Sequence, residues 1–328
     1  MKISIIIPVY NVEAYIVECL ESVAQQTYTG EMECLIVDDC GTDNSIPLAQ
    51  DFIDSYQGKM EFRILHHKKN RGLSAARNTG TNAATGDYIY YLDSDDVIIP
   101  ETIELMARIV QDHPQVEMVQ GGMGDMDGGI ISDFTNLQLP EYTDDLLWIS
   151  TNIFLYLPVS SCNRLQRKEF LLKENITFHE GIIHEDVPYN FLLAIKCRHI
   201  GFVRKNTYIV RKHRMGSITN TPQEQFALQS RLMIMHDNID AYLSCMFESK
   251  KLQLVALNAL WEKWLYYMMI HRKETLSCFT YEISKISEQM SSITPYPQKL
   301  VARCYHSLPF KIRGNKKIIR IVSFLMFC

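Results

Sequence analysis

Three carboxylates lie close together in the sequence, directly after an apolar stretch. Asp93, Asp95 and Asp96 follow the run Tyr88 to Leu92, so we expect them just past the end of a buried strand. Like charges at this spacing repel one another unless a cation offsets them, and a divalent ion held by carboxylates and substrate phosphates is the usual solution. A solvated acidic turn before a helix that Pro100 opens is the alternative. The cluster predicts a metal-dependent site for a phosphorylated ligand.

Two further carboxylate pairs have positions that suit chemistry. Asp38 and Asp39 end a second apolar run, where a carboxylate can accept a hydrogen bond from a nucleobase or a ribose hydroxyl. Glu185 and Asp186 open the apolar stretch Val187 to Ile195, which has helical spacing. A carboxylate at a helix start is often only a cap, and that alternative holds for both pairs.

The elements that must position these residues alternate between strand and helix patterns. Short apolar runs predict strands over Ile3 to Val9, Cys34 to Val37, Phe62 to Leu65 and Tyr88 to Leu92. Helical spacing between these runs predicts an α/β fold, with a mostly parallel sheet flanked by helices. In such sheets ligands bind beyond the carboxyl ends of the strands, where the strand order reverses. Both acidic clusters that follow strands fall on that edge.

Four segments are similar to those of a known family. They are Ser4 to Asn11, Val37 to Asp39, Asn70 to Gly80 and Gly86 to Asp96. In their order and spacing these segments resemble the inverting family 2 glycosyltransferases of the GT-A fold, of the type that builds bacterial polysaccharides. The chain has Cys40 and Gly41 where this family usually has Gly-Ser. We expect this departure to change the local turn without loss of binding.

The resemblance implies a site for a nucleotide-sugar donor, with Asp39 at the nucleobase and Asp38 in a supporting role. The residues implied in donor binding are Pro8, Tyr10, Asp39, Arg71, Arg77, Asp93, Arg211 and Ser217. Tyr10 could equally be a core residue, and Arg77 could be a buried partner for an aspartate. Arg71 and Arg77 are expected in a helix that leads into the fourth strand.

The resemblance also implies a Mn²⁺ or Mg²⁺ ion that stabilises charge on the departing nucleoside diphosphate. Asp95 is expected to bind this ion directly and Asp93 to contact ribose or ordered water, with Asp96 and His213 as further metal candidates. His213 belongs to a basic segment, Tyr208 to Thr219, that is similar to one closing over the diphosphate in the family. A solvated basic strand is the alternative for this segment.

For the reaction, the resemblance implies that Asp186 removes the proton from the acceptor hydroxyl and that Glu185 positions the acceptor. The expected chemistry is a single in-line displacement with inversion at the anomeric carbon. Intact Asp93, Asp95 and Asp186 argue against a catalytically inactive sugar-binding or scaffold protein. A sugar-1-phosphate nucleotidyltransferase, the other alternative, needs a glycine-rich phosphate loop, which Pro8 to Glu13 does not contain.

Length and composition fit two folded parts. The 328 residues are 47% hydrophobic and 22% charged, enough for a large core and a smaller appendage. We expect a GT-A domain over residues 1–222, with a donor half (1–100) and an acceptor half (101–222), and a helical C-terminal region over residues 223–328. The glycine-rich residues 121–129 are predicted to form a loop over the site.

Charge and cysteine content limit the partners and the compartment. The formal net charge of -5 argues against a nucleic-acid binder. Nine cysteines without a Cys-x-x-Cys pair, and a strand that begins directly after Met1, predict reduced thiols and a cytoplasmic location. The tail Lys311 to Cys328 is basic and then apolar, so it could bind the inner surface of the cell membrane, its own domain or a second subunit. No run approaches the ~18 apolar residues that cross a bilayer.

Together with the resemblance, these features predict transfer of a hexosyl or N-acetylhexosaminyl group from a nucleotide sugar, in the first instance a UDP-sugar. The expected acceptor is a hydroxyl of a glycan or a lipid-linked glycan in cell-surface polysaccharide synthesis. Absence of membrane spans and of a Gln-x-x-Arg-Trp motif favours transfer of one or a few sugars over polymer extrusion. Peripheral membrane contact and oligomer formation are left open.

Overall fold

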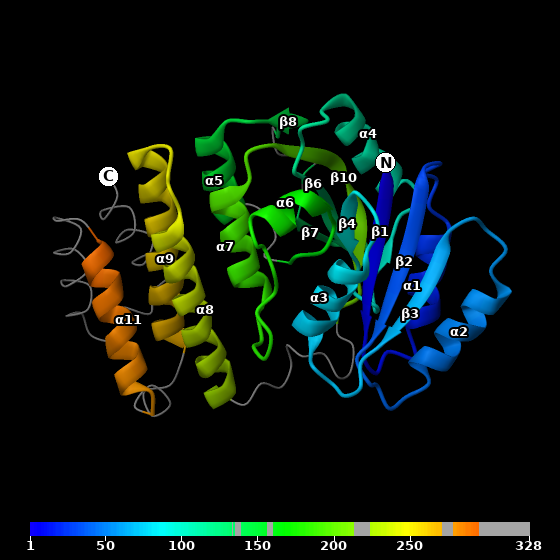
Figure 1. Cartoon of the computed structure of the whole chain (residues 1–328), viewed down its shortest axis with the longest axis horizontal. Coiled ribbons are helices and arrows are strands. Elements are labelled where there is room, and N and C mark those ends of the chain that lie inside the picture. The colour runs from blue at the N-terminus through cyan, green and yellow to red at the C-terminus, as the bar shows by residue number, and fades with distance from the viewer. Residues whose placement is uncertain (133, 135–138, 156–159, 213–223, 271–277, 295–328) are drawn as a thin grey trace. The chain divides into compact units, whose positions relative to one another are not determined.

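The computed structural model describes residues 1–132, 134, 139–155, 160–212, 224–270 and 278–294. The chain splits into two compact units (Figure 1). Unit 1 comprises Met1–Asp145, Tyr156–Gly181 and Lys196–Met215, and unit 2 comprises Leu146–Leu155, Ile182–Ile195 and Gly216–Cys328. The domain boundary predicted between residues 222 and 223 lies at the edge of a segment outside the described residues, and the domain division stays a prediction.

The described residues of unit 1 form a ten-stranded sheet with helices packed against it. The strands are β1 (Lys2–Val9), β2 (Glu31–Asp38), β3 (Glu61–His66), β4 (Tyr88–Tyr91), β5 (Val97–Ile98), β6 (Met118–Asp125), β7 (Ile130–Ser132), β8 (Tyr142–Thr143), β9 (Arg164–Arg167) and β10 (Ile200–Val210). The helices are α1 (Ile16–Ala24), α2 (Ser45–Ser55), α3 (Leu73–Ala83), α4 (Thr102–Asp112) and α6 (Lys168–Lys173). Each of the four predicted strands is present, because β-branched and aromatic side chains suit a buried pleated surface.

The strand order is β3-β2-β1-β4-β9-β6-β10-β5, with β7 paired to β6 and β8 paired to β10. From β3 to β4 every pair is parallel, whereas β9 runs antiparallel to both β4 and β6. Helix α3 packs on β1 and β2, and α4 packs on β6 and β10 (Figure 1). The predicted α/β fold with a helix-flanked sheet is confirmed, and the parallel half carries the donor-side motifs.

One segment predicted as a loop is mostly a strand. The sequence predicts a loop over residues 121–129, but β6 continues through Gly121 as far as Asp125. A Cβ atom at Gly121 would lie 2.1 Å from Oγ1 of Thr207 on the neighbouring strand β10. The glycine is therefore needed for close approach of β6 and β10. The turn follows at Gly128, whose φ of 79° is in the left-handed region that favours glycine.

A buried carboxylate joins the first strands of the parallel half. Glu33 on β2 is fully buried and accepts hydrogen bonds from Ser4 Oγ on β1 (2.6 Å), the Thr85 backbone N–H (2.6 Å) and Arg63 Nη2 on β3 (2.8 Å). Burial alone would raise the pKa of Glu33, but these donors outweigh burial and lower the pKa from 4.5 to about 2. These hydrogen bonds therefore stabilise the ionised form of Glu33.

Glu33→Gln should destabilise the protein at neutral pH and should do so less in acid. A depressed folded-state pKa contributes stability that is present above the ordinary pKa of 4.5 and is lost as the pH falls toward 2. Urea unfolding of the parent and the variant at pH 6 and pH 3 should show the difference in free energy of unfolding shrinking by about 2 kcal/mol in acid. An equal difference at both pH values would rule out this role for Glu33.

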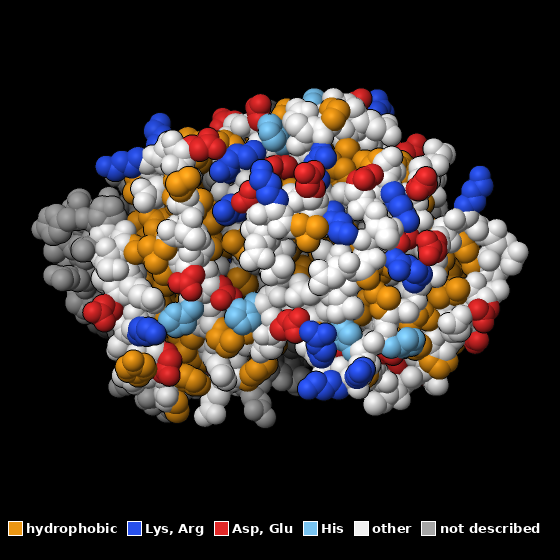
Figure 2. All heavy atoms as spheres, in the orientation of Figure 1, with side chains coloured by type: hydrophobic (Ala, Val, Ile, Leu, Met, Phe, Trp, Pro, Cys, Tyr) orange, Lys and Arg blue, Asp and Glu red, His pale blue; other side chains and the backbone are white. Residues whose placement is uncertain are grey.

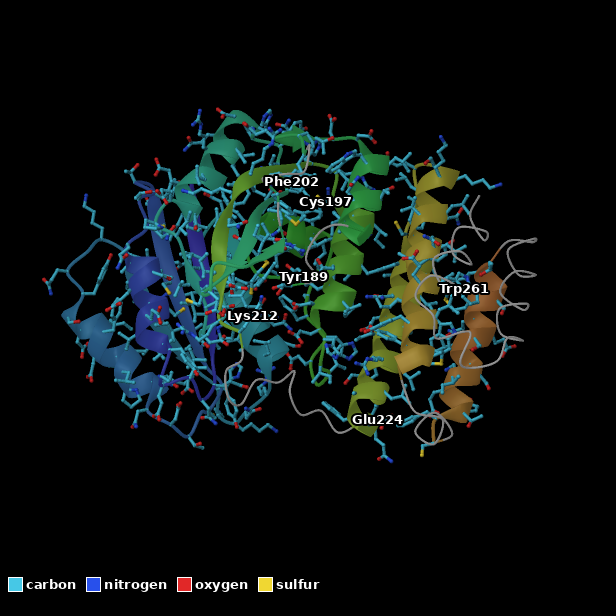
Figure 3. All side chains as sticks on the ribbon, turned by 180° about the vertical axis from the view of Figure 1, so that it is seen from behind. Tyr189, Cys197, Phe202, Lys212, Glu224 and Trp261 are labelled. Atoms are coloured by element: carbon cyan, nitrogen blue, oxygen red, sulfur yellow. The ribbon has the colours of Figure 1, made fainter. Side chains whose placement is uncertain are left out.

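Unit 2 is helical in its described residues. Its helices are α5 (Leu146–Leu155), α7 (Asp186–Lys196), α8 (Glu224–Ser244), α9 (Lys250–Ile270) and α11 (Thr280–Ile293). The apolar faces of α7, α8, α9 and α11 share one core, which includes Leu228 of α8, Leu260 of α9 and Ile286 of α11. Trp261 of α9 is buried in this core, and its Nε1 donates a hydrogen bond to Thr294 Oγ1 at 2.9 Å (Figure 3). The helical C-terminal region of the predicted fold class is present in these residues.

The described residues contain no helix that is both long enough and apolar enough to span a membrane. The basic and apolar tail, Lys311 to Cys328, lies outside the described residues, and its membrane contact stays a prediction. Figure 2 shows Lys and Arg side chains interspersed with Asp and Glu side chains on the face in view, in keeping with the formal net charge of -5.

Candidate active site

Three of the predicted donor residues, Tyr10, Asp39 and Asp93, follow the carboxyl ends of the adjacent parallel strands β1, β2 and β4. Val9 at the end of β1 is in register with Asp38 on β2, and Asp38 is in register with His66 on β3. On the other side of β1, Ile6 is in register with Tyr91 at the end of β4. The chain order therefore reverses between β1 and β4, which is where open α/β sheets bind their ligands.

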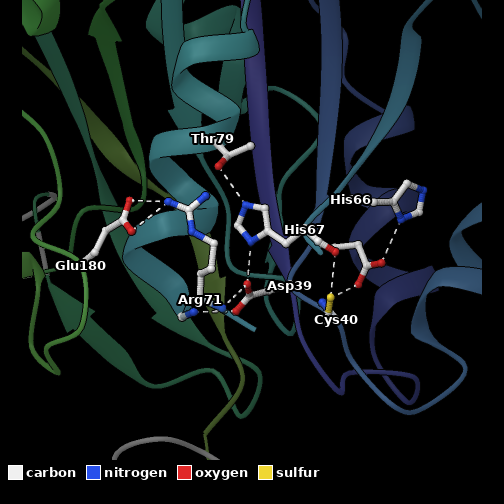
Figure 4. Close-up of polar contacts among 9 residues, drawn as sticks. Asp39, Cys40, His66, His67, Arg71, Thr79 and Glu180 are labelled. Atoms are coloured by element: carbon white, nitrogen blue, oxygen red, sulfur yellow. Dashed lines mark hydrogen bonds and ion pairs between the residues drawn. The ribbon is translucent and has the colours of Figure 1, made fainter. Parts of the chain in front are cut away.

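Asp39 anchors the loop between β3 and α3 (Figure 4). It is 3% exposed, and its carboxylate accepts hydrogen bonds from the backbone N–H groups of Arg71 (2.8 Å) and Gly72 (2.7 Å). Its Oδ1 also lies 2.6 Å from Nδ1 of His67, whose Nε2 lies 2.8 Å from Oγ1 of Thr79. These contacts fix the approach of the chain to α3, and a contact between Asp39 and a nucleobase stays a prediction.

Asp43, and not Asp39, contacts the start of helix α2. Asp43 Oδ1 accepts hydrogen bonds from the Ser45 backbone N–H (3.0 Å) and from Ser45 Oγ (2.6 Å), at the start of α2. Asp43 Oδ2 also accepts a hydrogen bond from the Glu13 backbone N–H at 2.8 Å, which ties the loops after β1 and β2 together. The hydrogen bonds that Asp39 accepts from backbone N–H groups come instead from the loop before α3.

Tyr10 and Pro8 end the first strand. Tyr10 is 47% exposed, which excludes the alternative that it is a core residue. Pro8 is buried in β1 and in register with Val37 on β2. Asn11 follows with a φ of 52°, and its Oδ1 accepts a hydrogen bond from the Thr42 backbone N–H at 2.7 Å. An exposed aromatic ring at this edge is suited to a flat nucleobase, and donor contact by both residues stays a prediction.

The family departure at Cys40 changes the residue type at a left-handed backbone position. Cys40 has a φ of 58°, and its backbone N–H donates to Asp38 Oδ1 at 3.0 Å. Its Sγ lies 2.8 Å from the carbonyl oxygen of His67. A glycine at this position adopts the same φ without the steric cost of a Cβ atom.

Cys40→Gly should therefore stabilise the protein by about 1 kcal/mol, because it removes the left-handed strain at the expense of one weak thiol hydrogen bond. The matched control is Cys40→Ala, which keeps the Cβ atom and loses the thiol, and it should not gain stability. Thermal unfolding of the three proteins measures the effect. Equal transition temperatures for the glycine and alanine variants would mean that the backbone at residue 40 is not strained.

Arg71 is not in the predicted helix, because α3 begins at Leu73 and Gly72 precedes it with a φ of 87°. The Arg71 guanidinium instead makes a bidentate ion pair with Glu180, with Nη2 at 3.0 and 2.9 Å from the two carboxylate oxygens (Figure 4). Both side chains are more than two-fifths exposed, so the pair is accessible to a competing anion. A role for Arg71 at the donor phosphates stays a prediction.

The chain turns directly after β4, and the Asp96 backbone N–H donates to the carbonyl oxygen of Asp93 at 3.0 Å. The Asp93 carboxylate lies 2.9 Å from Nη2 of Arg77, which is only 1% exposed. The Arg77 guanidinium also lies 5.1 Å from the ring centre of Phe178. Arg77 is thus a buried partner of an aspartate, the alternative that the sequence left open. Its contact with the donor stays a prediction.

Asp96 links this turn to the end of β10. It is 6% exposed, its Oδ2 accepts a hydrogen bond from Tyr208 Oη (2.8 Å), and its Oδ1 accepts one from the Arg211 backbone N–H (2.7 Å). Burial, together with the charges of Asp93 and Asp95, raises the pKa of Asp96 to about 8 in spite of these donors. Because Asp96 is buried whereas Asp93 and Asp95 are partly exposed, Asp93 and Asp95 are the better candidates for binding a cation.

The Arg211 side chain, predicted at the donor diphosphate, holds α1 against the carboxylate turn. It makes an ion pair with Glu18 and lies 4.9 Å from the ring centre of Tyr15. Its Nε donates a hydrogen bond to the carbonyl oxygen of Asp95 at 3.1 Å. These contacts give Arg211 a structural role beside the candidate site, and its role toward the donor stays a prediction.

The carboxylate turn fits a divalent cation in charge and in accessibility. The Asp93 side chain is 33% exposed and Asp95 is partly exposed, so a ligand can reach both. Within the described ranges, no three His, Cys, Asp or Glu side chains are grouped so that they could hold a metal ion without other ligands. One or two carboxylates can hold a divalent cation when substrate phosphate oxygens complete its coordination. His213 and Ser217 lie outside the described residues.

The predicted catalytic carboxylates belong to unit 2. Helix α7 begins at Asp186, and the Val187 backbone N–H donates to the carbonyl oxygen of His184 at 3.0 Å. His184 has a φ of 63°, a left-handed conformation that turns the chain just before the helix. Asp186 is partly exposed and Glu185 is 8% exposed. Their roles as base and as positioning residue stay predictions.

Sequence reasoning missed three residues of this region. His67 directly follows the third predicted strand, so its position at the ligand edge could have been inferred from the strand order. Tyr208 lies in the predicted basic segment, but roles were predicted only for other residues of that segment. Glu180 gave no signal, because a lone exposed glutamate in a loop is an ordinary feature. The pairing of Glu180 with Arg71 depends on tertiary structure alone.

Comparison with known proteins places these features in a wider group. A family model described as "Glycosyl transferase family 2" matches residues 4–169. Glycosyltransferase GlyA of Streptococcus pneumoniae serotype 4 is 29% identical over 250 residues, which is 73% of this chain and 33% of GlyA. The protein YibD of Escherichia coli (strain K12), described as an uncharacterized glycosyltransferase, is 30% identical over 253 residues, which is 71% of this chain and 70% of YibD.

A solved structure has a similar fold. The crystal structure of residues 1–349 of TarS from S. aureus, in complex with UDP-GlcNAc, superimposes with a TM-score of 0.69 at 21% sequence identity. The match covers 100% of this chain and 89% of the TarS chain.

Proposed function

Since the chain belongs to the family 2 glycosyltransferases, we propose that it transfers a sugar from a UDP-sugar to a hydroxyl of a glycan or a lipid-linked glycan, with inversion at the anomeric carbon. The observation that carries the choice of donor is the sheet edge between β1 and β4. There the exposed Tyr10, the Asp39 loop and the turn bearing Asp93 and Asp95 follow the ends of adjacent strands. TarS, which shares the fold, binds UDP-GlcNAc.

Each part of this edge has a distinct task in the proposed complex. The Tyr10 ring supplies a face for the nucleobase, and Asp39 accepts from its imide N–H while it holds the backbone of Arg71 and Gly72. Arg71 can exchange its exposed partner Glu180 for a donor phosphate, since a phosphate suits the guanidinium fork at least as well as a carboxylate.

Asp93 and Asp95 would hold Mn²⁺ or Mg²⁺, which supplies charge stabilisation for the departing diphosphate. Asp93 keeps its fixed position through the ion pair with buried Arg77, so that its remaining lone pairs face a constant direction. Asp96 supports the turn through Tyr208 and Arg211. The neighbouring carboxylates of Asp93 and Asp95, both partly exposed, place negative charge at the turn, which favours a cation there.

Asp186 is proposed as the base that takes the proton from the acceptor hydroxyl as the hydroxyl attacks the anomeric carbon. Its place at the first position of α7, partly exposed, suits a carboxylate that must reach a substrate. Glu185, almost fully buried beside it, would position this segment. The transferred group is proposed to be a hexosyl or N-acetylhexosaminyl group destined for a cell-surface polysaccharide, made at the cytoplasmic side of the membrane.

Ligand binding tests the proposed donor class. Calorimetric titration of the full chain with UDP, GDP, CDP and dTDP in the presence of Mn²⁺ should show tightest binding of UDP. Tyr10→Ala should weaken UDP binding by about tenfold, because base stacking on an aromatic ring is worth ~1–3 kcal/mol. Tyr281→Ala, at an exposed tyrosine of α11, is the matched control and should bind UDP like the parent. Preference for another nucleotide would overturn the UDP assignment, and binding of none would overturn the nucleotide-sugar donor itself.

A further inference from the structure

Unit 2 contains a group of cationic and phenolic side chains that the reaction described above does not use. Nη2 of Arg231 on α8 lies 3.3 Å from Nε2 of His184, two residues before Asp186. The Arg231 guanidinium also lies 5.7 Å from the ring centre of Tyr267 on α9. Lys263 precedes Tyr267 by one helical turn on the same helix, a spacing that puts both side chains on one face. We call these four residues, His184, Arg231, Lys263 and Tyr267, the cationic cluster.

The cationic groups of this cluster are poorly solvated. Burial lowers the pKa of Lys263, although neighbouring Glu262 acts in the opposite direction. Burial also lowers the pKa of Arg231. The pKa of His184 is lowered by burial and by the positive charges of Arg231 and Lys263, against an opposing effect of Asp186. Positive charges that have lost water gain strongly from an anion, because the anion replaces the missing solvation.

A buried hydroxyl provides an independent observation at the same place. Tyr267 is 3% exposed, and its Oη has no hydrogen-bond partner among the residues that the structure describes. A buried hydroxyl without a partner destabilises the folded state, so native proteins rarely keep one unless a ligand or water completes it. A phenolic O–H can donate a hydrogen bond to an anion seated beside these cations. The orphaned hydroxyl is therefore available to donate to an acceptor atom that the described residues do not supply.

We propose that the cationic cluster binds a phosphate group carried by the acceptor. Arg231 offers a planar fork of donors, Lys263 an ammonium group and Tyr267 a single hydroxyl, which together suit the several oxygens of a phosphate ester. Because His184 lies two residues before Asp186, a phosphate held here would bring a hydroxyl of the same molecule near that carboxylate. The binding of a phosphate group at the cluster does not depend on the proposed function. The assignment of that phosphate to the acceptor rests on the proposed function.

Titration of the full chain with sn-glycerol 3-phosphate tests the site, at constant ionic strength and without divalent ions. Binding should be saturable, and glycerol should not bind. Lys263→Met and Arg231→Gln should each weaken binding by about tenfold or more, because each removes a charge-assisted hydrogen bond. Lys251→Met, at an exposed position on the same helix α9, is the matched control and should bind like the parent.

Tyr267→Phe separates binding from folding. The change removes a hydroxyl that lacks a partner in the free protein, so the thermal transition should stay the same or rise. Binding of glycerol 3-phosphate should nevertheless weaken several-fold, since the bound state loses a hydrogen bond. This variant decides the question even if the charge variants do not fold. Unchanged binding in Tyr267→Phe, or an equal loss in Lys251→Met, would overturn the site.

A parallel titration with glycerophosphoglycerol distinguishes two sources of the phosphate. Tighter binding of the monoester supports a terminal phosphate on the acceptor, and tighter binding of the diester supports a phosphodiester or diphosphate link within it. Absence of binding for both would overturn the site. Nucleotide-sugar hydrolysis is measured separately. A chain that binds phosphate at the cluster but hydrolyses no nucleotide sugar would contradict the proposed function and leave the site standing, and the reverse result would overturn the site alone.

Discussion

Asp95→Asn is expected to remove most sugar transfer while the protein still folds. Asp95 lies on the turn after β4, is partly exposed, and is the residue proposed to bind the divalent ion. Loss of this ligand should slow transfer and donor hydrolysis about 100-fold or more, because a bound metal contributes several kcal/mol to stabilising charge on the leaving diphosphate. Initial rates at saturating Mn²⁺, calorimetry of Mn²⁺ binding in the presence of UDP, and thermal unfolding together measure the effect.

Two other aspartates sharpen this test. Asp51→Asn, at an exposed site on α2, is the matched control and should keep the parent rate. Asp93→Asn should lose both activity and stability, because it leaves the Arg77 guanidinium buried without this counter-charge. Asp95 is therefore the cleaner site for the metal assignment. A rate within a few-fold of the parent for Asp95→Asn, with unchanged Mn²⁺ affinity, would refute that assignment.

Asp186→Asn is expected to abolish transfer and to leave donor affinity nearly intact. An asparagine has the same shape but cannot accept the proton of the acceptor hydroxyl, and general-base catalysis contributes about 10²–10⁴-fold. Donor binding depends on the sheet edge between β1 and β4, which the change does not touch. Calorimetry of UDP-sugar binding beside a transfer assay measures the two effects in one protein.

The position of Asp186 also defines its control. Asp240→Asn, at an exposed position of α8 in the same unit, should behave like the parent in both assays. Glu185 is almost fully buried, so Glu185→Gln tests positioning and should raise the acceptor KM more than it lowers kcat. Loss of UDP-sugar affinity in Asp186→Asn with retained turnover would place Asp186 in the donor site and remove it as the base.

The fold could be predicted from sequence because its strands are signalled locally. The apolar runs at β1 and β2 are continuous and short, and Asp38 and Asp39 mark the end of β2. The glycines of residues 121–125 gave the opposite signal. Their reason is the approach of β10 to β6, a contact between residues more than eighty positions apart. A contact between such distant strands cannot be predicted from the local sequence.

At the candidate site, sequence identified the residues better than their partners. Asp39 and Asp93 follow the ends of β2 and β4, and their contact with a ligand stays a prediction. That Asp39 holds the loop before α3, and that Arg211 pairs with Glu18, depends on distant side chains meeting after folding. Charged residues in motifs were assigned to a ligand because the sequence shows their charge but not the protein groups that already satisfy it.

Release of UDP is the most direct test of the proposal that this protein is a metal-dependent glycosyltransferase that uses a UDP-sugar. Purified protein comprising residues 1–328 is incubated with a panel of UDP-sugars, and release of UDP is followed with Mn²⁺, with Mg²⁺ and with excess EDTA. We expect that at least one UDP-sugar is hydrolysed or transferred, that EDTA stops the reaction, and that added metal restores it. UDP release that is equally fast in EDTA would contradict the metal site at Asp93 and Asp95. No release from any UDP-sugar, alongside release from a sugar of another nucleotide, would contradict the donor assignment.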